Sequence, residues 1–167
     1  MDRTSERQRP FGLHALVDDI LASMRPSMKH LQLDIHNRVP DDMACNSYPG
    51  AIGQIVSNLL QNCTLHAFAD RTQGRIDIRA HTEGDMVVLE VQDDGLGMPA
   101  QVLRHVFDPF FTTRLGQGGS GLGLSVSHSL ASSVLGGTLS ATSEPQQGSC
   151  FCLRFLRDAP HTSEPNA

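Results

Sequence analysis

Four polar side chains recur at every fourth position of one apolar segment: Gln54, Asn58, Asn62 and His66. Four residues turn an α-helix through about 400°, so these side chains form one continuous stripe bordering the apolar face. Asparagine has a carbonyl oxygen that binds Mg²⁺ and an amide that donates to phosphate. A lone asparagine here would be a satisfied polar group at the core edge, but Asn58 and Asn62, one turn apart, favour ligand binding if a phosphate-binding loop lies elsewhere.

A second candidate is the motif DDGLGM, Asp93 to Met98, directly after the strand-like run VVLEV. A carboxylate at the buried end of a strand is unfavourable unless it accepts hydrogen bonds, and the exocyclic amine of adenine is one suitable donor. Gly95 and Gly97 would let the backbone approach a flat ring or adopt a positive φ. In isolation, however, the motif is more simply explained as an Asp-Gly turn.

The third candidate is GQGGSGLGLS, Gly116 to Ser125, where glycines lead into a helix. Backbone N–H groups at such a helix start can hold phosphate. A dinucleotide-binding loop needs a strand immediately before it, and here FDPFFTTRL precedes it. A Walker loop needs Gly-Lys-Ser/Thr, and the single lysine, Lys29, is far away. A flexible glycine linker would not explain why a strong helix begins inside the motif.

Hydrophobic periodicity predicts the elements that position these motifs. Three helices are expected. One starts at Leu13 and ends before Pro26, one spans 49–68, and one spans 122–135 with a cap at Gly136 and Gly137. Expected strands cover 31–39, 43–46, 74–81, 86–92, 138–144 and 149–156, with 74–92 as an antiparallel hairpin. The glycine-rich stretch 93–123 is too long for an ordinary connection and indicates a functional loop. The predicted fold is α+β, a two-layer α/β sandwich in which helices cover one face of a mixed, mainly antiparallel sheet.

Composition limits the function classes. The 167 residues suffice for one domain, which we place at 11–157 between a linker remnant, 1–10, and a polar tail, 158–167. The net charge of −5 argues against nucleic acid or an anionic membrane as the main partner. No signal peptide and no apolar run of about 18 residues is found. We interpret the four cysteines, Cys45, Cys63, Cys150 and Cys152, as reduced thiols of a cytoplasmic protein rather than a zinc site.

In order along the chain, NLLQNCTLHAF, DDGLGM, FDPFFTTR and GGSGLGLS resemble the N, G1, F and G2 boxes of the catalytic ATP-binding domain of bacterial two-component sensor histidine kinases. Each box is weak alone, but four in order over 11–156 are a specific signal. The resemblance implies the Bergerat ATP-binding fold shared with DNA gyrase and heat-shock chaperones. It also implies ATP and Mg²⁺ as ligands, and the phosphotransfer bundle of a parent kinase as partner, with a response regulator downstream.

The resemblance also implies a function for each box. Asn62 would bind Mg²⁺ with Asn58 in support, and Asp93 would accept the adenine amine. Residues 107–118 would form an ATP lid that Phe110 and Phe111 anchor, and Arg114 would contact the terminal phosphates. The nucleotide-binding residues implied in this way are Asn58, Asn62, His66, Asp93, Gly95, Gly97, Met98, Phe110, Thr112, Thr113, Arg114, Gly118, Gly119, Ser120, Gly121, Leu122 and Gly123.

The sequence departs from the family pattern in several places. Leu65 replaces a frequent lysine, Ser120 replaces threonine, and Ser47 stands where a helix-capping aspartate is usual, so that Ser47 could cap instead. None of the eight histidines is followed by Asp or Glu, as a phosphoacceptor histidine typically is. We therefore expect the kinase domain of a longer receptor, nearly inert without its acceptor bundle.

Two alternatives stay open. The first is a nucleotide-binding regulatory module without turnover, which the Leu65 departure supports. The second is a protein serine kinase of the anti-sigma-factor type, which the FDPFFTTR motif makes less favourable. Efficient ATP hydrolysis of the gyrase kind would need a glutamate on the 49–68 helix, and that helix has none.

Overall fold

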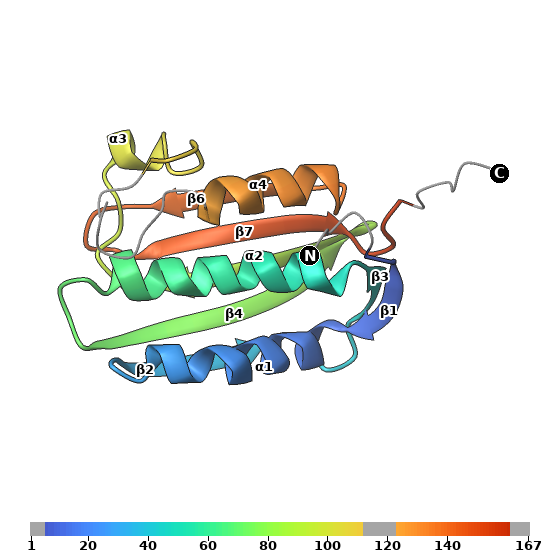
Figure 1. Ribbon diagram of the computed structural model, residues 1–167, viewed down its shortest axis with the longest axis horizontal. Coiled ribbons are helices and arrows are strands. Elements are labelled where there is room, and N and C mark those ends of the chain that lie inside the picture. Colours follow the sequence, from blue (N-terminus) through green and yellow to red (C-terminus); the bar gives the residue numbers. More distant parts are fainter. Residues whose placement is uncertain (1–5, 112–122, 161–167) are drawn as a thin grey trace.

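A computed structural model describes residues 6–111 and 123–160 of the chain. Its main sheet has five strands in the order β2-β4-β5-β7-β6, and helices α1, α2 and α4 lie across one face (Figure 1). The pair β2–β4 is parallel and the other neighbours are antiparallel. The predicted two-layer α/β sandwich with a mixed, mainly antiparallel sheet is therefore confirmed.

The elements follow one another as β1 Arg9–Gly12, α1 Leu13–Met24, a 3₁₀ turn Arg25–Met28, β2 Gln32–Arg38, β3 Ala44–Ser47, α2 Pro49–Asn62, a π-turn Cys63–Ala67, β4 Gln73–Glu83, β5 Met86–Asp93, α3 Ala100–Leu103, α4 Gly123–Ser133, β6 Thr138–Ser143 and β7 Ser149–Leu156. Strands β4 and β5 form the predicted antiparallel hairpin. The predicted cap after α4 is also present, because Gly136 has a φ of 66° and the Gly137 N–H donates to the Ala131 carbonyl at 2.8 Å.

The core lies between the sheet and the helices. Strand positions that alternate along the sequence point toward the helices, as period-two patterns predict. These inward residues are Ile76 and Ile78 of β4, Val87, Leu89 and Val91 of β5, and Phe151, Leu153 and Phe155 of β7, all at most 1% exposed. Helix α2 supplies the opposite wall through Ile52, Ile55, Val56 and Leu59, also at most 1% exposed.

Both ends of the packed unit extend beyond the expected limits of 11 and 157. Strand β1 begins at Arg9 and pairs with β3. At the other end Ala159 is 2% exposed, and its N–H donates to the Asn46 carbonyl at 2.8 Å. The Gln8 side chain links the two ends by donating to the carbonyls of Asn46 and Ala159, both at 3.0 Å. Within the described residues, no helix has the length and apolar character needed to cross a bilayer.

Candidate functional site

The polar stripe lies on α2, but the helix ends differently from the prediction. The predicted helix over 49–68 is present, but its α-helical part, α2, stops at Asn62, and a π-helical turn, Cys63–Ala67, follows. The Phe68 N–H donates to the Cys63 carbonyl at 3.1 Å, which is the wider hydrogen bond of this turn. The Ala67 carbonyl meanwhile accepts the Leu96 N–H at 2.9 Å. Such π-turns are frequent at functional sites, and here one joins α2 to the loop after β5.

Asp93 is a carboxylate in an apolar row. It continues the inward-facing series of β5 and is only 3% exposed. Its Oδ1 accepts the Gly95 N–H at 2.9 Å and the Ser149 N–H at 3.2 Å. Its Oδ2 accepts the thiol of Cys63 at an S–O distance of 3.7 Å. Burial raises the pKa of Asp93, while these three donors act in the opposite direction.

The loop 93–98 is held between the π-turn and the β6–β7 turn. A Cβ at Gly95 would overlap the Ala67 carbonyl. Gly97 has a φ of 69°, and a Cβ there would overlap the Glu144 carbonyl. The Met98 N–H donates to Ser143 Oγ at 2.8 Å. The two glycines and Met98, all predicted site residues, therefore shape this loop through close backbone packing.

Sequence reasoning missed the partners that the C-terminal strands supply. Ser149 lies directly opposite Asp93 in the β5–β7 register, and its Oγ is 2.8 Å from that of Ser143. Ser143 also donates to the Gly148 carbonyl at 2.9 Å. The sequence does contain a clue, because Ser149 is a polar residue two positions before Phe151 in the alternating pattern of β7 and therefore lies on the same face as Phe151. This alternation predicts that Ser149 faces inward, but it does not predict that Ser149 lies next to Asp93.

Asn58 connects the two helices beside the site. Its Nδ2 donates to Ser127 Oγ at 2.9 Å and to the Gly123 carbonyl at 3.0 Å, both in α4. Its Oδ1 accepts the Gln54 Nε2 at 3.0 Å. Ser127 is fully buried and donates in turn to the Gly123 carbonyl at 2.9 Å. The described contacts of Asn58 are thus structural, and its support of a metal ion stays a prediction.

We expect Asn58→Ala to lower the free energy of unfolding by about 1–3 kcal/mol, because it removes two hydrogen bonds between α2 and α4. Urea denaturation measures the loss. In a double-mutant cycle with Ser127→Ala, the coupling should be about 0.5–3 kcal/mol. Strictly additive losses would contradict this connection between the helices.

Asn62 is half-buried at the last position of α2, and the next residue, Cys63, contacts Asp93. The end of α2 and the end of β5 therefore meet, as the predicted site requires. His66 lies half-buried in the π-turn. Among the described residues, no group of three or more His, Cys, Asp or Glu side chains could hold a metal ion. Metal binding by Asn62 stays a prediction.

Two expectations about single residues are wrong. Phe110 does not anchor its segment, because its side chain is 71% exposed. Phe107 packs instead, with its ring 5.0 Å from that of His128 and 6.2 Å from that of Phe151. Ser47 does not cap α2, since Tyr48 is the N-cap residue and makes no side-chain cap bond. The buried Ser47 hydroxyl has no hydrogen-bond partner within the described part of the chain.

The predicted phosphate-binding residues Thr112, Thr113, Arg114, Gly118, Gly119, Ser120, Gly121 and Leu122 lie outside the described residues. Gly123 begins α4, where its carbonyl accepts from Asn58 and Ser127.

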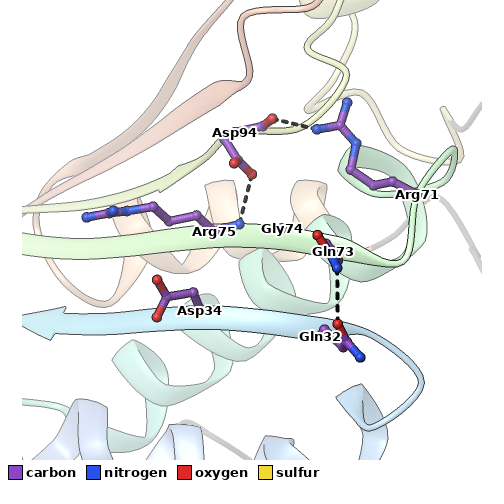
Figure 2. Close-up of a pocket in the computed structure, with 7 residues that line it drawn as sticks. All are labelled: Gln32, Asp34, Arg71, Gln73, Gly74, Arg75 and Asp94. Atoms are coloured by element: carbon purple, nitrogen blue, oxygen red, sulfur yellow. Dashed lines mark hydrogen bonds between the residues drawn. The ribbon is translucent and has the colours of Figure 1, made fainter.

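A separate hollow of about 610 Å³ opens at one end of β2 and β4 (Figure 2). Asp94 faces it, and accepts the Arg75 N–H at 2.8 Å through its side chain and Arg71 Nη1 at 3.0 Å through its carbonyl. Asp34 brings a second acidic side chain to the lining. The hollow includes neither Asp93 nor the α2 stripe, so the adjacent residues Asp93 and Asp94 face different environments.

The chain belongs to the family of histidine kinase-, DNA gyrase B- and HSP90-like ATPases, whose sequence profile matches residues 48–159. Within this family it is an ATPase domain of the sensor histidine kinase type. It is 38% identical over 153 residues to the sensor protein TorS of Escherichia coli K12, a match covering 90% of this chain and 16% of TorS. The sensor kinase PilS of Pseudomonas aeruginosa is 34% identical over 149 residues, covering 86% of this chain and 26% of PilS. The chain thus spans only a small part of these relatives.

Solved structures agree on the fold. The nucleotide-free catalytic domain of histidine kinase ThkA superposes with a TM-score of 0.77 at 21% identity, covering 91% of this chain and 97% of that one. ThkA bound to the response regulator protein TrrA gives a TM-score of 0.72 at 22% identity, covering 90% of this chain and 42% of that one.

Proposed function

We propose that this domain binds ATP with Mg²⁺ and donates the γ-phosphoryl group to a histidine on a separate dimerisation bundle. The observation that carries the proposal is Asp93, a buried carboxylate where β5 and β7 meet the π-turn after α2, in a chain of this ATPase family. Its Oδ1 is engaged by two backbone N–H groups. Its Oδ2 accepts one thiol and has capacity for another donor, which we assign to the adenine amine.

The divalent ion would be held at the other end of the nucleotide. Mg²⁺ in nucleotide sites usually keeps several waters and takes one or two protein oxygens together with phosphate oxygens. The half-buried Asn62 can supply such an oxygen. Asn58 would contribute by holding α2 against α4, because its amide nitrogen donates to Gly123 and Ser127 of α4. The bound ion would neutralise charge on the phosphates during transfer.

The proposed partners follow from the reaction class. Phosphoryl transfer depends mainly on positioning and charge neutralisation, so the domain needs a bundle that presents the acceptor histidine. The ThkA complex contains a response regulator, and we propose a response regulator as the indirect partner here. We also propose a cytoplasmic location for this domain.

The test is calorimetric titration of the 167-residue chain with ATP, with and without Mg²⁺. We then expect label from γ-³²P-ATP on a histidine when the parent bundle is added. Absence of ATP binding would refute the proposal at its first step. A regulatory module, favoured by Leu65 in place of a cationic side chain, would bind ATP and label nothing. Acid-stable label on a serine of a protein partner would favour a serine kinase, since phosphohistidine is hydrolysed in acid.

We expect Asn62→Ala to lower ATP affinity in Mg²⁺ by about tenfold or more, because changes around bound metals commonly have effects of this size. Affinity measured in excess chelator should stay within about twofold, since the base contacts are kept. The matched control is Gln61→Ala, an exposed neighbour on the same helix. Equal losses with and without Mg²⁺ would show that Asn62 is not a metal ligand.

A further inference from the structure

The thiol of Cys63 has a specific partner rather than a purely apolar environment. Cys63 is fully buried at the start of the π-turn, and its Sγ lies 3.7 Å from Asp93 Oδ2. The other carboxylate oxygen is held by the N–H groups of Gly95 and Ser149. The two oxygens of Asp93 therefore differ, since Oδ1 is engaged by backbone and Oδ2 by a side chain.

A thiol is a suitable hydrogen-bond donor to a carboxylate oxygen that must also bind a ligand. An S–H group is a weak donor, so it can orient a carboxylate oxygen while leaving most of that oxygen's acceptor strength available. An ionised carboxylate has about four lone-pair sites, and the described donors to Asp93 occupy three. Oδ2 therefore keeps acceptor capacity for a further donor.

The buried thiol and the buried carboxylate influence each other's pKa. Burial raises the pKa of Cys63 well above its usual value, and the neighbouring Asp93 carboxylate raises it further. Conversely, the Cys63 hydrogen bond lowers the pKa of Asp93 against the larger effect of burial. Asp94, the other charged neighbour, raises the pKa of Asp93.

We propose that Cys63 is a positioning residue for base recognition, whose thiol holds Oδ2 of Asp93 toward the exocyclic amine of the purine. The inference rests on the proposed ATP binding and adds a determinant of selectivity for 6-aminopurines. If Cys63 were only a core residue, its removal would affect all purine nucleotides alike. If it orients Oδ2, its removal affects those that carry the amine.

The test compares ATP with purine riboside 5′-triphosphate, in which hydrogen replaces the amine, both in Mg²⁺. For Cys63→Ala we expect ATP affinity to fall about 3- to 10-fold, as for loss of one supporting hydrogen bond, and affinity for the analogue to change by less than about twofold. Cys63→Ser, which keeps a donor and is closer in volume, should retain part of the discrimination. The matched control is Cys45→Ala, which removes another buried free thiol, in β3, and should leave both affinities within about twofold.

A second readout needs no nucleotide. Carbon-13 NMR titration of the Asp93 carboxyl should give a higher pKa in Cys63→Ala than in the parent, because a donor to the ionised form is lost. As the pH falls, ATP binding by Cys63→Ala should therefore begin to weaken at a higher pH than ATP binding by the parent. Equal losses for the two nucleotides, or an unchanged Asp93 pKa, would overturn this inference alone. Failure of the parent to bind either nucleotide would overturn the proposed function and this inference with it.

Discussion

Replacing Asp93 with asparagine is expected to weaken ATP binding by about 10- to 100-fold, because a hydrogen bond to a charged acceptor is lost. The asparagine Oδ1 can still accept from Gly95 and Ser149, as the aspartate Oδ1 does. Its Nδ2, however, replaces Oδ2 and brings an N–H group toward the amine of the base, so donor meets donor. Calorimetric titration with ATP in Mg²⁺ measures the effect.

The same substitution is not expected to lower stability at neutral pH. Burial raises the pKa of Asp93 above its value in the unfolded chain. The folded state therefore binds the proton more tightly, and ionised Asp93 subtracts stability as pH rises through that pKa. Asparagine carries no such penalty. The control is Asp94→Asn, which changes the neighbouring carboxylate on the side of the hollow and should leave ATP affinity within about twofold. Parent-like ATP binding by Asp93→Asn would refute the assignment of Asp93 to the base.

Gly97→Ala is expected to lower the free energy of unfolding by about 2–5 kcal/mol, the sum of a left-handed backbone penalty and an overpacked contact. Gly97 has a φ of 69°, and the added Cβ would overlap the Glu144 carbonyl in the β6–β7 turn. The loop 93–98 would have to move away from Ser143, and ATP binding should be lost with it. Thermal and urea unfolding measure the change.

The matched control is Gly84→Ala in the β4–β5 turn. Gly84 has a similar φ of 61°, but an added Cβ would meet no atom within 4 Å. Only the backbone penalty of about 1–2 kcal/mol applies there. If the two variants lost equal stability, the close approach between the loop and the β6–β7 turn would not be energetically important.

The fold could be predicted because its periodic signals are strong. The alternation in β5 and β7 and the three-and-four spacing in α2 give each element and its buried face without tertiary information. The same alternation makes Asp93 conspicuous, because a carboxylate occupies an inward-facing position. Alone, however, the motif from Asp93 to Met98 is more simply an Asp-Gly turn, and its prediction as a base-binding site comes from the family resemblance.

The remaining details depend on contacts between distant segments. The π-turn after Asn62 is accompanied by a hydrogen bond between Ala67 and Leu96, which no local pattern encodes. The spacing of Asn58 and Asn62 predicts ligand binding, but it does not reveal the contact of Asn58 with Ser127, which lies 69 residues along the chain. The family resemblance implies that Phe110 anchors its segment, yet the Phe110 side chain is exposed and the nearby Phe107 packs against Phe151 instead.

The proposed base-recognition end of this domain is assembled from the π-turn, the loop after β5 and the β6–β7 turn, none of which has the required partners by itself. An unfolded or partly folded chain would lack this arrangement and would not bind the nucleotide in the same way. A nucleotide that occupies it would consequently act as a thermodynamic ligand of the native state, adding about 2.7 kcal/mol at a concentration 100 times its dissociation constant. Cellular nucleotide would then protect the domain against unfolding as well as serve its chemistry.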